Sequence, residues 1–280
     1  HVRVRATWSI AAVGPMVAGM AAIAGRRCIV KGAVATAVAF RRPASHLWLR
    51  GAAHRQLSSG SPLIELRECQ LSCAGAPDFM ATVNEHSDVI RGTLPLRLFS
   101  LPTAGGVLNV ATHLYAYSGG HAERDACLAA ENSGDKCREL RRRLAPGIQQ
   151  QSSLLFVEAP LVGDFKLHGL LDPSCPGGEP AAGAIYELRR YQLQLGYDTV
   201  PRFLKLYASG LPSKLEAPGT DPSTTLVSLL YSDVGSLNEV IELWRHGGGT
   251  SAMETSRKAA RAASEWRSAI ADIAGLAVRF

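Results

Sequence analysis

The sequence predicts an α+β protein that contains the same β-α-β-β-α-β unit twice. The first observation is a repeated block, because Ile64–Leu71 returns as Tyr186–Leu193 at a shift of 122 positions. The second observation is that Gly106–Tyr115 returns as Gly235–Trp244 at a shift of 129 positions. Two blocks recur in the same order and at nearly the same spacing, which indicates a duplicated unit.

The first copy is expected to span residues 62–161, and its elements follow from the periodicity of its apolar residues. Alternating apolar and polar residues over 63–71 are typical of a strand. The stretch Thr103–Gly106 predicts a hairpin turn between two further strands. The expected elements are a strand at 63–71, a helix at 77–91, strands at 94–100 and 106–117, a helix at 120–144 and a strand at 153–158. This order is that of a ferredoxin-like unit.

The second copy is expected to span residues 184–280 and to repeat that order. Its first helix shows apolar residues every three or four positions, at Val200, Phe203, Leu204, Tyr207 and Leu211. The expected elements are a strand at 185–195, a helix at 197–210, strands at 225–232 and 236–245, and a helix at 251–272. Only 14 residues follow Trp266, so the last strand is either shortened to Leu276–Phe280 or truncated.

Residues 162–183 are expected to link the two copies. This stretch contains Pro173, Pro176 and Pro180 together with several glycines. Proline and glycine interrupt regular structure and are typical of linkers. The stretch also lacks apolar periodicity, so we expect it to add nothing to the core.

The repeated blocks carry a family resemblance. Each copy has the pattern Glu-Leu-Arg-x-x-Gln-Leu, then a Leu-Asn pair, then a long helix. The helix contains Arg257 and Trp266 in the second copy and Arg124 in the first. This pattern resembles the NIPSNAP family over about residues 63–160 and 184–275. The resemblance implies the fold of the dimeric α/β barrel superfamily, with antiparallel sheets that carry helices on one face.

Residues 1–57 are predicted to be a mitochondrial transit peptide that is disordered. The stretch before Glu65 contains eight Arg and Lys31 but no acidic residue. A basic, Ala-rich leader without carboxylates is typical of organelle import, and Arg55–Ser58 resembles a mitochondrial processing site. We therefore expect the protein in the mitochondrial matrix, with a plastid as the alternative.

The charge balance after the leader argues against nucleic acid as a partner. Residues 65–280 carry 21 Lys and Arg against 24 Asp and Glu, so no basic footprint for nucleic acid remains.

The apolar run Ala11–Gly25 has 15 residues and contains Pro15, which is short of the roughly 20 residues that a membrane span needs. We expect neither nucleic acid nor a membrane span.

Six residues on two equivalent strands form the candidate ligand pocket: His113, Tyr115 and Tyr117 in the first copy, and Glu242, Trp244 and His246 in the second. Alternation along a strand places each set of three on one face. That face either lines a barrel cavity for an apolar ligand or packs against helices. His113 is either an axial haem ligand or a hydrogen-bonded histidine inside the barrel.

Four further residues form a candidate ion-pair or anion-binding cluster. Glu65 and Arg67 share one strand face, and Glu187 and Arg189 occupy the equivalent positions in the second copy. Such a cluster is either a cross-strand ion-pair network or a site for a carboxylate or phosphate.

The predicted function is a non-enzymatic binding or scaffold protein, or an accessory subunit of a mitochondrial complex. No nucleophile–base, zinc or phosphate-loop motif occurs in the sequence, so we expect no catalytic residue, metal or cofactor. The resemblance implies protein partners and a link to mitochondrial quality control and mitophagy, and it allows a homo-oligomer. The alternative is a small-molecule enzyme of the same superfamily, either like a cofactor-independent monooxygenase or haem-binding.

Overall fold

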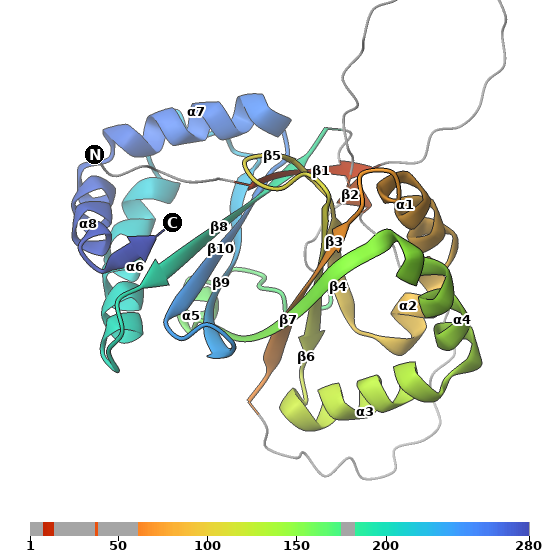
Figure 1. Cartoon of the computed structure of the whole chain (residues 1–280). Coiled ribbons are helices and arrows are strands. Elements are labelled where there is room, and N and C mark those ends of the chain that lie inside the picture. Colours follow the sequence, from red (N-terminus) through yellow and green to blue (C-terminus); the bar gives the residue numbers. More distant parts are fainter. Residues whose placement is uncertain (1–7, 14–36, 39–60, 175–182, 280) are drawn as a thin grey trace, which may run out of the picture.

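The computed structural model describes residues 8–13, 37–38, 61–174 and 183–279. Over these residues two α+β units share one continuous sheet, and their helices pack on the outside of it (Figure 1). The strand order is β2-β1-β8-β10-β9-β7-β3-β6-β4, with β11 also paired to β8 and β5 also paired to β1. The predicted α+β class, with antiparallel sheets covered by helices, is confirmed.

The first unit has the predicted ferredoxin-like order. Its strands lie in the order β7-β3-β6-β4, and all of these pairs are antiparallel. Its elements are β3 (Leu63–Leu71), α1 (Ala76–Glu85), α2 (Ser87–Thr93), β4 (Leu96–Ser100), β5 (Pro102–Ala104), β6 (Val110–Tyr117), α3 (Gly120–Ser133), α4 (Asp135–Leu144) and β7 (Ile148–Glu158). The helix predicted over 120–144 is divided at Gly134, since glycine is a poor helix former.

The second unit repeats the order but differs in its helices. Its elements are β8 (Ile185–Leu193), α6 (Thr199–Leu215), β9 (Thr224–Val234), β10 (Glu239–His246), α7 (Gly249–Ala262), α8 (Ser264–Ala274) and β11 (Ala277–Arg279). The first helix, α6, is continuous over 17 residues, whereas α1 and α2 divide the equivalent stretch of the first unit. The last strand, β11, has 3 residues, in agreement with the shortened strand considered above.

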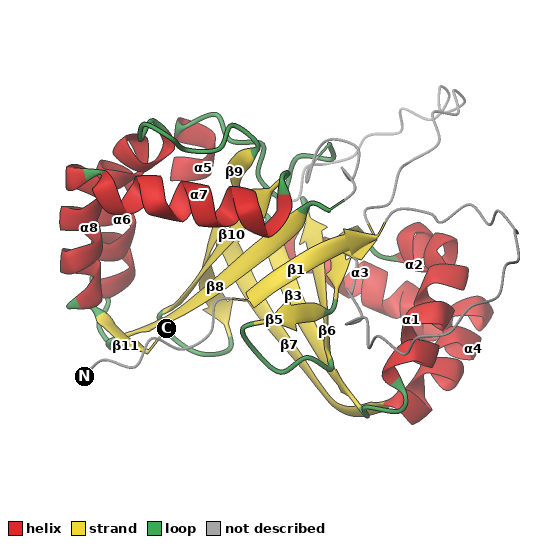
Figure 2. Cartoon of the chain, turned by 90° about the horizontal axis from the view of Figure 1, so that it is seen from above, coloured by secondary structure: helices red, strands yellow, loops and turns green. Residues whose placement is uncertain are grey.

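The two units meet along β7 and β9, which pair in antiparallel fashion from Leu155↔Val234 to Glu158↔Leu230. On the other side of the second unit, β1 (Trp8–Val13) pairs with both β8 and β5. Ser9 of β1 lies opposite Glu187, just as Leu155 of β7 lies opposite Glu65 in the first unit. Strand β1 therefore occupies the part of the β8 edge that the short β11 leaves unpaired (Figure 2).

The inner side of the sheet is filled by an apolar core that both units share. Its members alternate along the strands and are buried: Ile64, Leu66, Leu98, Leu114, Ala116, Phe156, Leu170, Tyr186, Leu188, Val227, Leu230, Ile241 and Leu243. The residues between them face the helices, where separate apolar clusters form in each unit. Since the interior is packed, any sizeable ligand cavity has to lie between the sheet and its helices.

The linker contributes to this core, and the prediction that it adds nothing is wrong at Leu170. The segment after β7 begins with α5 (Leu161–Asp164), and Leu170 is completely buried among residues of both units. Its backbone N–H donates to the Glu158 carboxylate at 2.7 Å. Burial raises the pKa of that carboxyl group. Sequence periodicity could not find Leu170 because a single anchoring residue has no period.

Two short strands fall inside the predicted transit peptide. These are β1 and β2 (Ala37–Val38); the other residues of 1–57 lie outside the described part of the chain. Among the described residues, no helix combines the length and the apolar character that crossing a membrane requires.

Candidate functional site

All ten candidate residues lie on strands β3, β6, β8 and β10, on the side of the sheet that faces the helices. Their even-numbered neighbours on β3 and β8, such as Leu66 and Leu188, fill the interior instead. The interpretation as a barrel-lining face is therefore corrected: the polar face is covered by helices of its own unit. Seven of the ten line one of two cavities, one in each unit, whereas Glu65, Tyr117 and Glu242 line neither.

The larger cavity belongs to the second unit and has a volume of about 960 Å³. This volume lies at the upper end of the range for small-molecule sites, roughly 300–1,000 Å³. Strands β8 and β10 supply Glu187, Arg189, Trp244 and His246 to its wall. Helices α6, α7 and α8 supply most of the other lining residues, among them Lys214, Leu215, Arg257, Ala260, Arg261, Trp266, Arg267, Ile270 and Ile273.

Glu187 organises the base of this cavity. Its carboxylate accepts hydrogen bonds from Arg189 Nε at 2.6 Å, from Arg257 and, at 3.2 Å, from the ring of His246. The side chain of Glu187 is 1 % exposed. Burial disfavours the carboxylate, but the hydrogen bond from His246 and the charge of Arg189 outweigh it and hold the pKa of Glu187 well below its usual range. Glu187 is thus a fixed anion held by basic side chains from three elements.

A second buried carboxylate, Glu242, lies beside the first. It accepts hydrogen bonds from Tyr191 Oη at 2.6 Å and from Trp244 Nε1 at 2.7 Å. The Arg189 guanidinium lies 3.5 Å away and therefore bridges Glu242 and Glu187. Burial, followed by the charge of Glu242, raises the pKa of Tyr191 well above its ordinary value. Glu242 is absent from the cavity wall, and its role is to orient Trp244 and Arg189.

The residue that sequence reasoning missed is Lys214, near the end of α6. Its Nζ lies 3.6 Å from the centre of the Trp244 ring and 4.3 Å from that of Trp266. Nζ is buried without a hydrogen-bond partner among the described residues. Burial and the charge of Arg189 lower the pKa of Lys214 to about 7, although Glu242 opposes them. The counterpart of Trp266 in the first unit is Cys137, so this pair of indoles exists only in the second unit.

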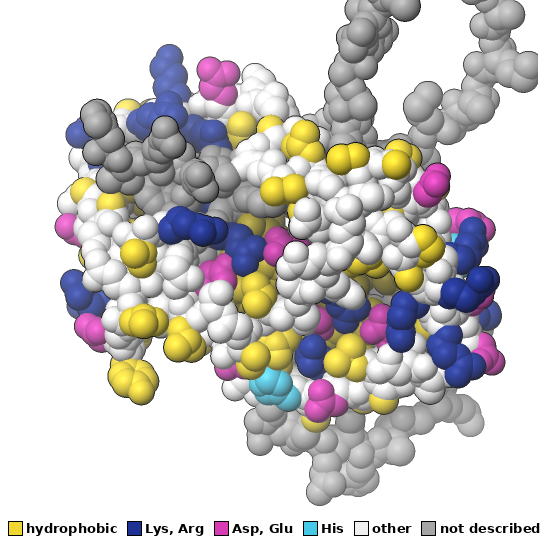
Figure 3. Space-filling model, in the orientation of Figure 1, with side chains coloured by type: hydrophobic (Ala, Val, Ile, Leu, Met, Phe, Trp, Pro, Cys, Tyr) yellow, Lys and Arg dark blue, Asp and Glu magenta, His cyan; other side chains and the backbone are white. Residues whose placement is uncertain are grey.

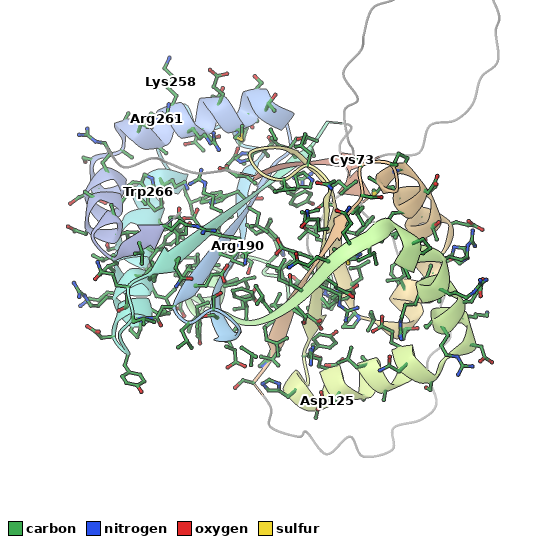
Figure 4. All side chains as sticks on the ribbon, in the orientation of Figure 1. Cys73, Asp125, Arg190, Lys258, Arg261 and Trp266 are labelled. Atoms are coloured by element: carbon green, nitrogen blue, oxygen red, sulfur yellow. The ribbon has the colours of Figure 1, made fainter. Side chains whose placement is uncertain are left out.

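A glycine on α6 allows Trp266 to reach this position. A Cβ at Gly210 would lie 2.6 Å from Ala269 Cβ and 3.2 Å from Trp266 Cε3. Because Gly210 has no side chain, α8 approaches α6 closely and Trp266 lies over Lys214. Trp266 appears between the helices and the sheet in Figure 4.

The mouth of the cavity is basic. Arg261 at the end of α7 and Arg267 on α8 line it and are exposed. No carboxylate of the described residues lies within ion-pair distance of either guanidinium. Figure 3 shows Lys and Arg side chains over α7 and beside α8, and a second group of them on the opposite side of the molecule, over α4. An anion that enters here meets cations that are not already neutralised.

The cavity in the first unit is much smaller, at about 120 Å³. Arg67, His113 and Tyr115 line it, but Tyr117 does not. Glu131 occupies the position of Ala260 and bonds Arg67 Nη1 at 3.3 Å, so a charged pair fills space that is open in the second unit.

His113 cannot serve as the haem ligand of the enzymatic alternative in this arrangement. Its ring is buried and packs 4.7 Å from the Phe99 ring and 6.0 Å from the Tyr115 ring. Burial and the charge of Arg67 lower the pKa of His113 to about 3. The adjoining 120 Å³ lies below the range of small-molecule pockets, and a porphyrin does not fit beside the ring.

The four ion-pair candidates form two separate clusters, one in each unit. Arg67 Nε donates to Glu65 at 3.2 Å, and Tyr117 Oη and Arg124 Nε donate to the same carboxylate at 3.0 and 3.1 Å. This cluster corresponds to the one around Glu187. Among the described residues, no group of three or more His, Cys, Asp or Glu is placed to hold a metal ion.

An ion pair between the units uses other residues. Arg190 on β8 contacts Glu68 on β3 at 3.0 Å and Glu239 at 2.5 Å. Glu68 and Arg190 occupy equivalent positions of the repeated block. Figure 4 shows Arg190 near the middle of the molecule, where β8 approaches the first unit.

Comparison with known proteins supports the fold. No family model matches the sequence, and no curated protein matches it. A candidate monooxygenase from Fusobacterium nucleatum superposes over 79 % of this chain and 89 % of its own, with a TM-score of 0.52 and 7 % identity. A candidate monooxygenase from Lactobacillus acidophilus covers 78 % of this chain and 90 % of its own, with a TM-score of 0.49 and 9 % identity.

A single-unit relative is also similar. A NIPSNAP domain protein of uncharacterised function from Burkholderia xenovorans covers 35 % of this chain and 94 % of its own, with 21 % identity and a TM-score of 0.33. The chain therefore shares the overall fold of the Fusobacterium nucleatum protein, and it contains two α+β units in one polypeptide.

Proposed function

We propose that the chain is a small-molecule-binding protein whose ligand site is the cavity of the second unit. The observation that carries the proposal is a 960 Å³ cavity that combines aromatic and aliphatic walls with an excess of basic side chains. The proposed ligand is an organic anion with an apolar body. The first unit, with 120 Å³, serves as the packed partner that completes the barrel.

The charge of the ligand follows from the cations that line the cavity. Glu187 is the acidic residue of the lining, and it is already bound by Arg189, Arg257 and His246. Arg261 and Arg267 remain available at the mouth. Guanidinium groups bind carboxylates and phosphates through paired hydrogen bonds, so a carboxylate or phosphate of the ligand fits here.

The apolar part of the ligand follows from the walls. Trp244 and Trp266 close one side of the cavity, and Leu215, Ile270 and Ile273 line other parts of it. Binding sites of this size gain most of their affinity from apolar contact, while a few polar groups fix the orientation of the ligand. An aryl or alkyl carboxylate or phosphate satisfies both requirements.

We expect Arg261→Gln to weaken the binding of benzoate and phenyl phosphate by about fivefold, since one exposed charge-assisted contact contributes on the order of 1 kcal/mol. Isothermal titration of the full chain measures this change, and native mass spectrometry shows the stoichiometry. The matched control is Lys258→Gln, which removes one positive charge from the outer side of the same helix (Figure 4). Equal weakening by both variants, or equal binding of uncharged benzyl alcohol, would contradict the proposal.

We further propose that this binding protein acts in the mitochondrial matrix, as an accessory subunit or scaffold linked to mitochondrial quality control. The acid-free, Arg-rich stretch before Glu65 supports the location. Residues 1–60 fused to a fluorescent protein should direct it to mitochondria, and replacing the eight arginines with glutamine should abolish import. A plastid or cytosolic signal from the unmodified fusion would rule out the location. Co-migration of the tagged chain with a larger complex in gently solubilised mitochondria tests the partner role.

A further inference from the structure

Lys214 is placed where a lysine amine is rarely found. It lies in the last turn of α6 and lines the 960 Å³ cavity. The side chain keeps some exposed surface, but Nζ has none and donates no hydrogen bond to a described residue. An amine is usually solvated or ion-paired, because burying it without a partner costs several kcal/mol. The simplest explanation for a buried amine without a partner is that it serves a function other than stability.

The surroundings of Nζ favour neither protonation state strongly. The faces of Trp244 and Trp266 attract an ammonium ion. Burial and the guanidinium groups of Arg189 and Arg257 favour the neutral amine, whereas Glu187 and Glu242 oppose them. The other titratable groups facing this region are Tyr191, Tyr207 and His246. Both forms of the amine are therefore available near neutral pH.

We propose that Lys214 forms a covalent imine with the carbonyl group of a small oxo-acid bound in the cavity. This inference rests on the proposed function. The oxo-acid is an organic anion of the proposed class, and its carboxylate would bind the basic side chains that line the cavity. Lys214 lines the cavity in which the oxo-acid would bind. A desolvated lysine near other cations is the arrangement in which amines act as nucleophiles.

The reaction is a condensation that needs no further reagent. The lone pair of neutral Nζ attacks the carbonyl carbon and forms a C–N bond, and the carbonyl oxygen takes up the first of the two amine protons. The two hydrogens of the amine leave with that oxygen as water, while the C–O bond breaks and the C=N bond forms. No electron is gained or lost, and the imine returns to amine and oxo-acid by addition of water.

The class of ligand follows from the neighbours of the amine. An aldehyde or ketone alone would satisfy Nζ but leave Arg261 and Arg267 without an anion. A 2-oxo-acid presents a carboxylate one bond from the reactive carbon, so the two groups can reach neighbouring cations and the amine together. An apolar substituent on the other side of the carbonyl would lie against Ile270 and Ile273, which also line the cavity.

The test is reductive trapping with glyoxylate as the probe. The full chain is incubated with glyoxylate and sodium cyanoborohydride at pH 7, and modified lysines are located by peptide mass mapping. We expect Lys214 to be labelled roughly tenfold or more faster than Lys205, an exposed residue of the same helix. The reason is that about half of an amine with a pKa of about 7 is neutral at pH 7, against fewer than one in a thousand for an ordinary lysine.

Two controls make the result decisive. Lys214→Arg keeps a cation between the indoles and should lose the selective adduct, while circular dichroism and benzoate binding show that it folds. Labelling of Lys214 no faster than that of Lys205, or an undiminished adduct in Lys214→Arg, overturns the proposal. If benzoate still binds in that case, only the imine is excluded. If benzoate does not bind either, the proposed ligand site has failed as well.

Discussion

Glu187→Ala is expected to lower the free energy of unfolding by about 3–5 kcal/mol, because it removes the shared acceptor of a buried ionic cluster. Arg189 would keep Glu242 as a partner. His246, whose side chain is 3 % exposed, and Arg257, which is 29 % exposed and lines the cavity, would lose the carboxylate that they contact. Urea denaturation followed by tryptophan fluorescence measures the change, since Trp244 and Trp266 lie in the same cluster.

The control for Glu187→Ala is Glu254→Ala, on the exposed side of α7. Replacement of an exposed residue without an ion pair usually changes stability by no more than about 0.5 kcal/mol. A loss below about 1 kcal/mol for Glu187→Ala would mean that the cluster relaxes or admits water. In that event Glu187 would have to be regarded as a ligand-side group and not as a structural anchor.

His113→Phe is expected to make the protein more resistant to acid than the parent chain. The pKa of His113 is lowered to about 3 in the folded protein, against roughly 6.5 in the unfolded chain. Below pH 6.5 the unfolded chain binds a proton that the folded protein does not, so the parent loses stability as the pH falls from 6.5 to 3. The loss is about 1.4 kcal/mol per pH unit within that window. Phenylalanine does not titrate and suits the contacts with Phe99 and Tyr115.

The measurement is urea denaturation of both proteins at pH 7, 5.5 and 4.5. The difference in unfolding free energy should move in favour of His113→Phe by about 1.4 kcal/mol between the two lower values. A difference that is independent of pH would show that His113 titrates normally and is hydrated.

The topology of each unit was predictable because it depends on patterns that the sequence displays directly. Alternating apolar and polar residues identified the strands, and the repeated blocks indicated that the second unit has the same order of elements as the first. The pairing of β7 with β9 was not predictable, since alternation identifies a strand but not its neighbour. The position of β1 was not predictable for a second reason. A basic, acid-free leader is expected to be cleaved from the protein and therefore not to pair with a strand of its sheet.

The candidate site was predictable in part for a similar reason. A period of two selects residues that share a face, so Glu187 and Arg189 were predicted on one face of their strand, and Trp244 and His246 on one face of theirs. Periodicity does not say which face is inside, so the sequence left open whether these faces line a barrel cavity or pack against helices. Lys214 could not be found, because lysine near the end of an amphipathic helix is usually exposed. Only the packing of Trp266 shows that it is covered.

The ion pair between Glu68 and Arg190 affects which units can pair with each other. These residues occupy equivalent positions in the two units and meet at 3.0 Å. Two first units arranged in the same way would bring two carboxylates together, and two second units would bring two guanidinium groups together. Like charges in such a contact cost several kcal/mol, whereas the covalent fusion supplies the opposite charge at a high effective concentration. Divergence of one symmetric position thus makes each unit select the other half of its own chain over a second copy of itself.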